Sequence, residues 1–375
     1  MIIISGIILA LYCSLLIAFI MGFDKVELFK PPKSIAKTKF SVIIPFRNEV
    51  ENLNDLLYSI SLLNYPKELF EILLVDDDSK DDSVHLIKNF TTKNDKLNIK
   101  IITNNSRTNS PKKDAIQTAI LQANFDWIIT TDADCIVPEN WLKIFDAYIQ
   151  KHETKLIAAP VTYVANKTFL EQFQLLDFLS LQASTIGSFG IHKPFLCNGA
   201  NLCYEKQAFI QVNGFEGNEH IASGDDIFLL EKLFKKHPDK VHFLKSNEII
   251  VKTKPQKSFK ELLSQRIRWA AKTTSFTSRF AKFVGVTVLL INLLVVMTLV
   301  LFLFNLFHWE LLLAIIIIKF ILDYILLNKA YRFYKQHLLF RSYCIGSLFY
   351  PFFSMFVAIV SLQTTYSWKG RRFNK

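Results

Sequence analysis

The sequence predicts a membrane-anchored α/β protein, in which transmembrane helices at both ends flank one water-facing domain with a mostly parallel sheet. Hydrophobic residues make up 51% of the 375 residues, and they gather in long blocks with few charges. Between the blocks, short apolar runs alternate with amphipathic stretches, as the strands and crossover helices of parallel sheets do. A chain this hydrophobic is not intrinsically disordered.

Residues 1–22 form the first apolar block, which is long enough as a helix to cross a bilayer. A cleaved signal peptide is the disfavoured alternative, because no basic residue precedes the block and no small-residue cleavage pattern follows it. A basic linker, residues 23–39, follows instead, with Lys25, Lys30, Lys33, Lys37 and Lys39. Since basic flanks stay in the cytoplasm, we expect residues 22–283 to be cytoplasmic.

The predicted domain covers residues 40–270 and begins with alternating strands and helices. Strands are predicted at 40–45, 70–75, 98–103, 127–131 and 156–161, and helices at 50–63, 83–91, 112–123 and 141–150. A further helix at 169–190 is too polar to span a membrane, and we expect it at the membrane surface or against the spans.

Polar clusters follow three of the predicted strands, at residues 47–49, 76–78 and 132–134. Ordinary turns also favour Asp and Asn, but turn chemistry explains one such cluster better than three in register. Ligands of open α/β sheets bind beyond the carboxyl ends of the strands. The clusters therefore predict a binding site at this edge of the sheet.

Two motifs in this region suit a diphosphate and its metal. Asp132 and Asp134 flank one residue after a strand, where both carboxylates can reach Mg²⁺ or Mn²⁺. Lys112 and Lys113 open a predicted helix, whose N-terminus favours anions, although a solvated helix start is an equal alternative.

Later motifs suit proton transfer and acceptor binding. Asp225 and Asp226 begin an apolar helix, where we expect one to cap the helix and the other to act as a base. Gln265, Arg268 and Trp269 share one helical face at the membrane entry, although membrane anchoring is an alternative role for the basic and aromatic residues.

The C-terminal membrane region is predicted at 284–363, after an interfacial helix at 271–283. Two spans, at about 284–307 and 311–327, are followed by a block at 343–362 that contains Pro351. A third crossing would place the basic tail, residues 364–375 with Lys369, Arg371, Arg372 and Lys375, outside the cell, against the positive-inside rule. A third span and a re-entrant segment therefore both stay open.

Eight motifs occur in the order seen in membrane-bound family 2 glycosyltransferases, which include cellulose, chitin and hyaluronan synthases and ceramide glucosyltransferases. The motifs are FSVIIPFRNE (40–49), LLVDDDSKDDS (73–83), PKKDAI (111–116), TDADC (131–135), NGANLCYEKQAF (198–209), GF (214–215), SGDDIFLL (223–230) and QRIRW (265–269). The chain resembles this family over residues 40–282 and in its membrane layout. The resemblance implies a GT-A fold, which is a Rossmann-like α/β glycosyltransferase domain.

The resemblance also implies roles for individual residues. Pro45, Glu49, Asp76 and Asp77 match the pocket for the base and ribose, and Lys112 and Arg268 match contacts to the diphosphate. Asp132 and Asp134 match the DxD pair, with Asp134 carrying most of the coordination of Mg²⁺ or Mn²⁺. Asp226 matches the catalytic base, and Gln265 and Trp269 match the acceptor site. The family usually has Glu at position 225 and Gly at positions 78 and 111, so Asp225 stays an alternative base.

We therefore expect an inverting enzyme that transfers a sugar from a nucleotide sugar, mainly a UDP-sugar, to a lipid or glycan acceptor in a bacterial inner membrane. A subunit of a processive polysaccharide synthase is the alternative, and an oligomer or synthase complex is possible. An inactive partner of such a complex is disfavoured because the acids and QRIRW are present. We expect no nucleic-acid binding, because the basic residues behind the net charge of +11 cluster at the membrane ends.

Overall fold

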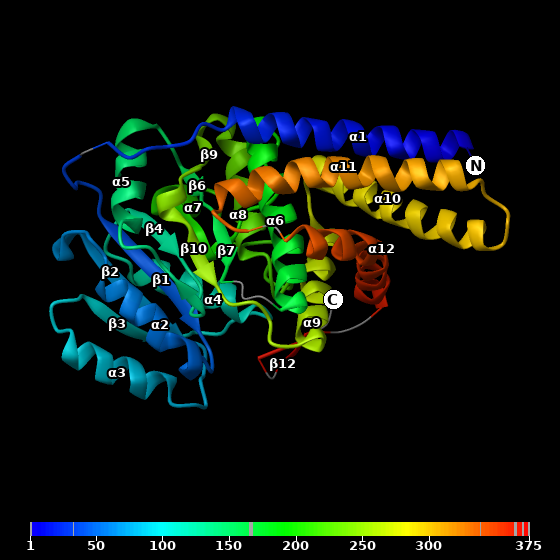
Figure 1. The fold of residues 1–375 in the computed structure, drawn as a ribbon. Coiled ribbons are helices and arrows are strands. Elements are labelled where there is room, and N and C mark those ends of the chain that lie inside the picture. The colour runs from blue at the N-terminus through cyan, green and yellow to red at the C-terminus, as the bar shows by residue number, and fades with distance from the viewer. Residues whose placement is uncertain are drawn as a thin grey trace.

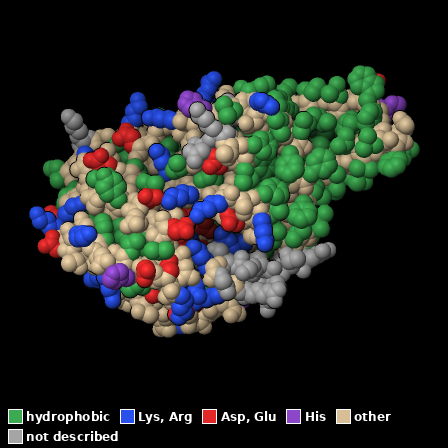
Figure 2. Space-filling model, turned by 60° about the horizontal axis from the view of Figure 1, so that its bottom comes forward, with side chains coloured by type: hydrophobic (Ala, Val, Ile, Leu, Met, Phe, Trp, Pro, Cys, Tyr) green, Lys and Arg blue, Asp and Glu red, His purple; other side chains and the backbone are tan. Residues whose placement is uncertain are grey.

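The computed structural model describes residues 2–32, 34–164, 168–337, 339–363, 366–369 and 371–373, so Lys33 and Lys375 of the predicted basic flanks lie outside the described part. An α/β domain forms one end of the molecule, and long helices project from it (Figure 1). Apolar side chains cover the projecting helices, whereas charged side chains gather on the domain (Figure 2). This division matches the pattern of hydrophobic blocks in the sequence.

The main sheet has seven strands in the order β3-β2-β1-β4-β8-β6-β9. Their bounds are β1 Phe40–Phe46, β2 Phe70–Asp76, β3 Ile99–Thr103, β4 Trp127–Thr130, β6 Leu156–Ala158, β8 Leu202–Glu205 and β9 Val241–Phe243. Only β8 runs antiparallel to its neighbours. β1 pairs with β2 in parallel from end to end, which brings Phe46 beside Asp76 at the carboxyl edge. The mostly parallel sheet is confirmed.

The predicted strand at 156–161 is wrong as a single element. β6 ends at Ala158, and β7 (Val161–Tyr163) belongs to a second sheet with β5 (Cys135–Ile136) and β10 (Val251–Thr253). Pro160 separates the two strands and has no N–H for a sheet ladder.

Helices cover the sheet on both sides (Figure 1). They are α2 Val50–Ser61, α3 Ser83–Lys93, α4 Pro111–Gln122, α5 Trp141–Lys151, α7 Lys206–Gln211 and α8 Asp225–Lys236, whereas α9 (Phe259–Ala271) packs against α12 (Phe340–Gln363). Short 3₁₀ turns occur at Lys67–Leu69, Gly199–Asn201, Pro238–Lys240, Asn247–Ile249 and Lys272–Ser275. The four helices predicted before residue 151 are each found within about two residues of their expected bounds, which is the usual uncertainty of a helix end.

Helix α6 (Phe169–Gly190) joins the domain to the long apolar helices, and its packing against α1 (Ile2–Lys25) agrees with one of the two positions expected for this polar segment. It also packs against α11 (Trp309–Phe333). The crossing with α1 depends on glycine, because a Cβ on Gly22 would lie 2.1 Å from the carbonyl oxygen of Gly187. Any larger residue at this crossing would force the two helices apart.

Within the described chain, three helices are long and apolar enough to cross a membrane: α1, α10 (Arg279–Leu303) and α12 (Phe340–Gln363). The segment predicted as a span at 311–327 lies in α11, which packs along α1 and α10. α11 carries an ion pair between Lys319 Nζ and Asp323 Oδ2 at 2.5 Å, so the two charges near the middle of this helix are paired with each other.

The predicted interfacial helix at 271–283 is wrong. The segment instead contains the end of α9, a 3₁₀ turn, an extended stretch and the start of α10. Glu231 accepts hydrogen bonds from the backbone N–H groups of Thr277 and Ser278, and the Ser278 hydroxyl caps α10 at Ala281 N (3.2 Å). These contacts hold the turn in place, because they satisfy backbone N–H groups at the start of α10. Ser and Thr side chains favour such positions, where they bind the backbone in place of helix hydrogen bonds.

Candidate active site

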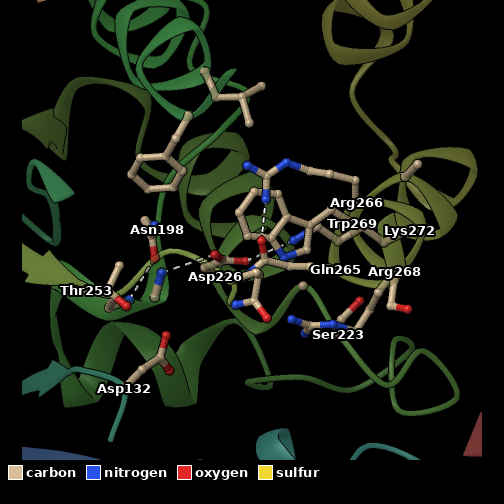
Figure 3. A pocket seen from close by; sticks show the side chains of 18 of the residues that line it. Asp132, Asn198, Ser223, Asp226, Thr253, Gln265, Arg266, Arg268, Trp269 and Lys272 are labelled. Atoms are coloured by element: carbon tan, nitrogen blue, oxygen red, sulfur yellow. Dashed lines mark hydrogen bonds and ion pairs between the residues drawn. The ribbon is translucent and has the colours of Figure 1, made fainter. Parts of the chain in front are cut away.

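A cavity of about 1670 Å³ opens at the carboxyl ends of β1, β2 and β4. Its opposite wall comes from α9, α10 and α12, so it extends from the sheet to the membrane helices. Figure 3 shows part of this cavity, with Asp226 near the centre and Gln265, Arg268 and Trp269 of α9 beside it. The position at the carboxyl edge agrees with the site predicted from the polar clusters.

Three of the four residues expected in the base and ribose pocket line the cavity: Pro45, Glu49 and Asp77. Asp77 is only 5% exposed, and its carboxylate accepts a hydrogen bond from Asn104 Nδ2 at 2.8 Å. Asp76 does not line the cavity, because its Oδ1 accepts from the backbone N–H of Ser79 at 3.0 Å and closes the turn. The contacts of Asp76 therefore support the alternative interpretation, in which this residue stabilises an ordinary turn.

The C-terminal hairpin of β11 (Tyr366–Trp368) and β12 (Arg371–Phe373) brings two cations to the same acids. Lys369 Nζ lies 2.7 Å from Glu49 Oε1, and Arg371 Nη1 lies 2.6 Å from Asp77 Oδ2. The sequence analysis missed these contacts, because the residues lie about 300 positions apart. Its one available signal was the basic tail, which membrane orientation alone also explains.

Lys112 lies between two groups of acids. Its Nζ is 2.7 Å from Asp132 Oδ1 and 3.3 Å from Asp225 Oδ2. Burial opposes the charged form, but these carboxylates outweigh it and raise the pKa of Lys112. Lys113 does not line the cavity and instead donates to two backbone carbonyls of the loop before α8, so of these two lysines Lys112 is the one whose ammonium group faces the cavity.

The donor set of Asp132 and Asp134 fits a divalent cation. Burial, the Asp132 carboxylate and Glu49 together raise the pKa of Asp134 to about 6. A hard cation would relieve this concentration of negative charge, and carboxylate oxygens are its preferred ligands. Among the described residues no group of three or more His, Cys, Asp or Glu side chains could hold a metal ion, so a donor diphosphate or water would supply further ligands.

Asp225 and Asp226 begin α8 directly after Gly224, which adopts a left-handed φ of 86°. Burial raises the pKa of Asp225 despite the nearby Lys112. Burial also acts on Asp226, but Lys272, Lys112 and the amides of Ile227 and Gly199 outweigh it and lower its pKa. Asp226 Oδ2 accepts from Gly199 N at 3.0 Å, and the side chain of Asp226 is more exposed than that of Asp225 (14% against 9%).

Gln265, Arg268 and Trp269 all line the cavity, as their helical spacing predicts. Ser258 starts α9 with a capping box in which its hydroxyl accepts from Glu261 N and Glu261 accepts from the N-cap backbone. The cap fixes where the helix begins and therefore which side chains face the cavity.

Arg266, which the sequence analysis did not single out, organises this face of α9. It is 5% exposed, and its guanidinium pairs with Asp177 of α6, donates to Gln265 Oε1 and lies 4.3 Å from the ring centroid of Trp269. Burial opposes the charge, but Asp177 outweighs it and raises the pKa of Arg266. Arg266 therefore holds two cavity side chains, Gln265 and Trp269, in place.

Two family profiles match the chain. Residues 41–209 match glycosyl transferase family 2, and residues 127–366, more than half of the chain, match glycosyl transferase family group 2. The chain belongs to glycosyl transferase family group 2. It is a glycosyltransferase, and its α/β domain has the GT-A fold.

Curated relatives agree with this assignment. Glycosyltransferase AglE of Haloferax volcanii is 26% identical over 230 residues, which cover 61% of this chain and 70% of AglE. Poly(ribitol-phosphate) beta-N-acetylglucosaminyltransferase TarS of Staphylococcus aureus is 29% identical over 119 residues, which cover 32% of this chain and 20% of TarS. The chain thus spans only a fifth of the length of TarS.

Among solved structures, a mannosyltransferase from Pyrobaculum calidifontis has a TM-score of 0.59 and 14% identity, with 96% of this chain and 99% of that chain covered. That enzyme was solved in complex with GDP-Man and Mn²⁺. At this identity the similarity concerns the fold, which extends over nearly the whole of both chains.

Proposed function

We propose that this glycosyltransferase transfers a sugar from a UDP-sugar to a membrane-associated acceptor and inverts the anomeric carbon. One observation carries the proposal: Glu49, Asp77, Lys112, the Asp132–Asp134 pair, Asp226 and the Gln265, Arg268 and Trp269 side chains line a single cavity. Nucleotide, metal, base and acceptor residues expected from separate stretches of the sequence therefore meet at one place.

The donor is proposed to lie along the carboxyl edge of the sheet. Pro45, Glu49 and Asp77 would contact its base and ribose, and Lys112 and Arg268 would contact its diphosphate. Asp134 and Asp132 would hold Mg²⁺ or Mn²⁺, which supplies positive charge next to the leaving diphosphate. Fixed charges aimed at the leaving group contribute a large part of such catalysis.

The base is proposed to be Asp226. It takes the proton of the acceptor hydroxyl while the acceptor oxygen bonds to the anomeric carbon from the face opposite the diphosphate. The bond between that carbon and the diphosphate oxygen breaks, and the nucleoside diphosphate leaves with the electron pair. The lowered pKa keeps Asp226 deprotonated but also makes it a weaker base, so the choice of Asp226 over Asp225 rests on its more exposed side chain.

The domain is proposed to face the cytoplasm of a bacterial cell, with α12 in a re-entrant or interfacial position. Gln336, just before α12, donates to the carbonyl of Tyr163 at 3.3 Å. Arg371, just after α12, pairs with Asp77. Both flanks of α12 thus contact the domain, an arrangement that leaves the basic tail on the cytoplasmic side, in agreement with the positive-inside rule.

The proposal is tested with purified protein in nanodiscs and a panel of UDP- and GDP-sugars, each with Mn²⁺ or Mg²⁺, scored by release of the nucleoside diphosphate. Asp134→Ala is the paired variant. Metal-dependent release from one UDP-sugar, lost in Asp134→Ala, is the expected result. Release only from a GDP-sugar would correct the donor, and absence of nucleotide binding would contradict the proposal.

A further inference from the structure

We infer that the acceptor is a lipid whose hydrocarbon chain lies in a groove between α10 and α12. The inference rests on the proposed function and names the acceptor class for the same site. The α10–α12 groove is the part of the cavity lined by Gly285, Val288, Leu289, Ser354, Val357 and Ala358. It is continuous with the space around Asp226 and Trp269, so a molecule in the groove reaches the reaction centre.

The chemistry of the groove differs from that of the rest of the cavity. Beyond Lys282, the α10 residues that line the cavity are all apolar: Val284, Gly285, Val286, Val288 and Leu289. The α12 wall adds Phe353, Val357, Ala358 and Leu362, and its polar groups are the hydroxyls of Tyr350, Ser354 and Ser361. A glycan chain would leave most of its hydroxyl groups without hydrogen-bond partners here, at a large cost in free energy. A hydrocarbon chain carries no such groups, and its burial is favourable.

The groove is hollow because small residues face it. Gly285, Ser354 and Ala358 are all small, and a Cβ added at Gly285 would meet no atom within 4 Å. Asn292 Nδ2 lies 3.4 Å from Ser354 Oγ, which joins the two helices just beyond the last α10 residue that lines the groove.

The α10 side of the cavity is nearly as long as one leaflet of a bilayer is thick. The lining residues of α10 run from Ala281 to Leu289, which is about 12 Å along the helix at 1.5 Å per residue. Half of a hydrocarbon core is about 15 Å thick. A lipid of the cytoplasmic leaflet can therefore place its chain in the groove and its head group beside Trp269 and Asp226.

Two glycine variants test the inference. Gly285→Leu fills the groove, whereas Gly6→Leu is a matched control on α1, since a Cβ at Gly6 also meets no atom within 4 Å and Gly6 does not line the cavity. Leu favours a helix more than Gly does, so both variants are expected to fold. The proteins are reconstituted in nanodiscs of bacterial total lipid extract.

Three quantities are measured: transfer of labelled sugar into organic-soluble product in the nanodiscs, nucleotide release by hydrolysis in lipid-free detergent, and photo-crosslinking in the nanodiscs by a diazirine-bearing hexadecanol probe. For Gly285→Leu we expect transfer and crosslinking on α10 and α12 to fall about tenfold or more, with hydrolysis within about twofold of wild type. Gly6→Leu is expected to match wild type in all three.

The inference would be overturned if Gly285→Leu transferred sugar at the wild-type rate. An absence of crosslinks on α10 and α12 in the wild-type protein would overturn it as well. Failure of the proposed function is a separate result, in which the wild-type protein neither binds nor hydrolyses any nucleotide sugar. The crosslinking comparison between Gly285→Leu and Gly6→Leu would still decide whether the groove binds a hydrocarbon chain.

Discussion

The two ends of the cavity have opposite chemistry. At the sheet edge, carboxylates and cations form a paired set in which Lys112 bridges Asp132 and Asp225, and Arg371 meets Asp77. Between α10 and α12, the same cavity has mainly apolar walls, with the hydroxyl groups of Tyr350, Ser354 and Ser361. Trp269 and Arg266 of α9 lie close to Gln265 in the same cavity (Figure 3).

The two ends of the cavity therefore indicate two different properties of the enzyme, its reaction class and its acceptor. A charged sheet edge is suited to any nucleotide sugar and its metal, so it indicates the reaction class. The apolar end is suited to a particular type of acceptor, so it indicates the substrate. Changes at the charged end should therefore affect donor chemistry, and changes at the apolar end should affect acceptor use.

The largest effect is expected from Asp226→Asn. Loss of a general base typically lowers kcat by about 10²–10⁴. Donor binding should change little, because the nucleotide contacts proposed above do not include Asp226. Turnover and donor affinity are measured together, with Asp225→Asn as the neighbouring control. Full activity in Asp226→Asn with loss in Asp225→Asn would assign the base to Asp225.

Arg266→Met tests the junction between the two ends. Arg266 and Asp177 are both 6% exposed in their side chains, and removal of one partner leaves a buried unpaired charge. The free energy of unfolding should fall by about 3–5 kcal/mol, as measured by chemical denaturation in detergent. An Arg266→Met, Asp177→Leu double variant should recover much of the loss, and equal stability of the two variants would argue against the ion pair as the cause.

The pH dependence of metal affinity tests Asp134. Its pKa is raised to about 6, so the carboxylate gains a proton as the pH falls through 6, and Mn²⁺ must then displace that proton. Mn²⁺ affinity in the presence of UDP should fall by up to about tenfold between pH 6 and pH 5, whereas an ordinary Asp would resist protonation until about pH 4.

The measurement is Mn²⁺ binding by electron paramagnetic resonance at pH 5, 6 and 7.5. Asp134→Asn should bind Mn²⁺ weakly and lose the pH dependence. A wild-type affinity that stays constant from pH 7.5 to pH 5 would show that Asp134 does not ligate the metal.

A smaller effect is expected from the C-terminal hairpin. Lys369 and Arg371 neutralise acids that would otherwise repel an anionic donor, but both cations are partly exposed. The Lys369→Ala, Arg371→Ala double variant should raise the donor KM about two- to fivefold, less at high salt. Lys329→Ala, which breaks the exposed pair with Asp24 away from the cavity, is the control. An unchanged KM would exclude a role of the hairpin in donor binding.

The sequence predicted the charged end of the cavity well, because strand periodicity and the strand-end rule depend on local patterns. Glu49, Asp77, Asp132 and Asp134 all line the cavity as expected. Asp76 does not, because the turn after β2 uses its carboxylate to bind a backbone amide. A strand boundary shifted by one residue reverses the direction of a side chain, and a sequence pattern does not fix that boundary.

Contacts between segments that are distant in the chain could not be predicted from the sequence. Arg266 faces α6, where Asp177 lies 89 positions earlier, and helical spacing within α9 contains no information about that partner. Arg371 reaches Asp77 across 294 positions through a short hairpin. The groove likewise depends on how α12 packs against α10, and each helix alone resembles an ordinary apolar segment.

The most direct test of a cavity with a donor end and a lipid end is the fate of the transferred sugar. Wild-type protein in bacterial total lipid extract is given the active labelled nucleotide sugar with Mn²⁺, and label is followed in the organic and aqueous phases. The account predicts that label enters an organic-soluble product in step with nucleotide release. Label that accumulates only in a water-soluble polymer would contradict it.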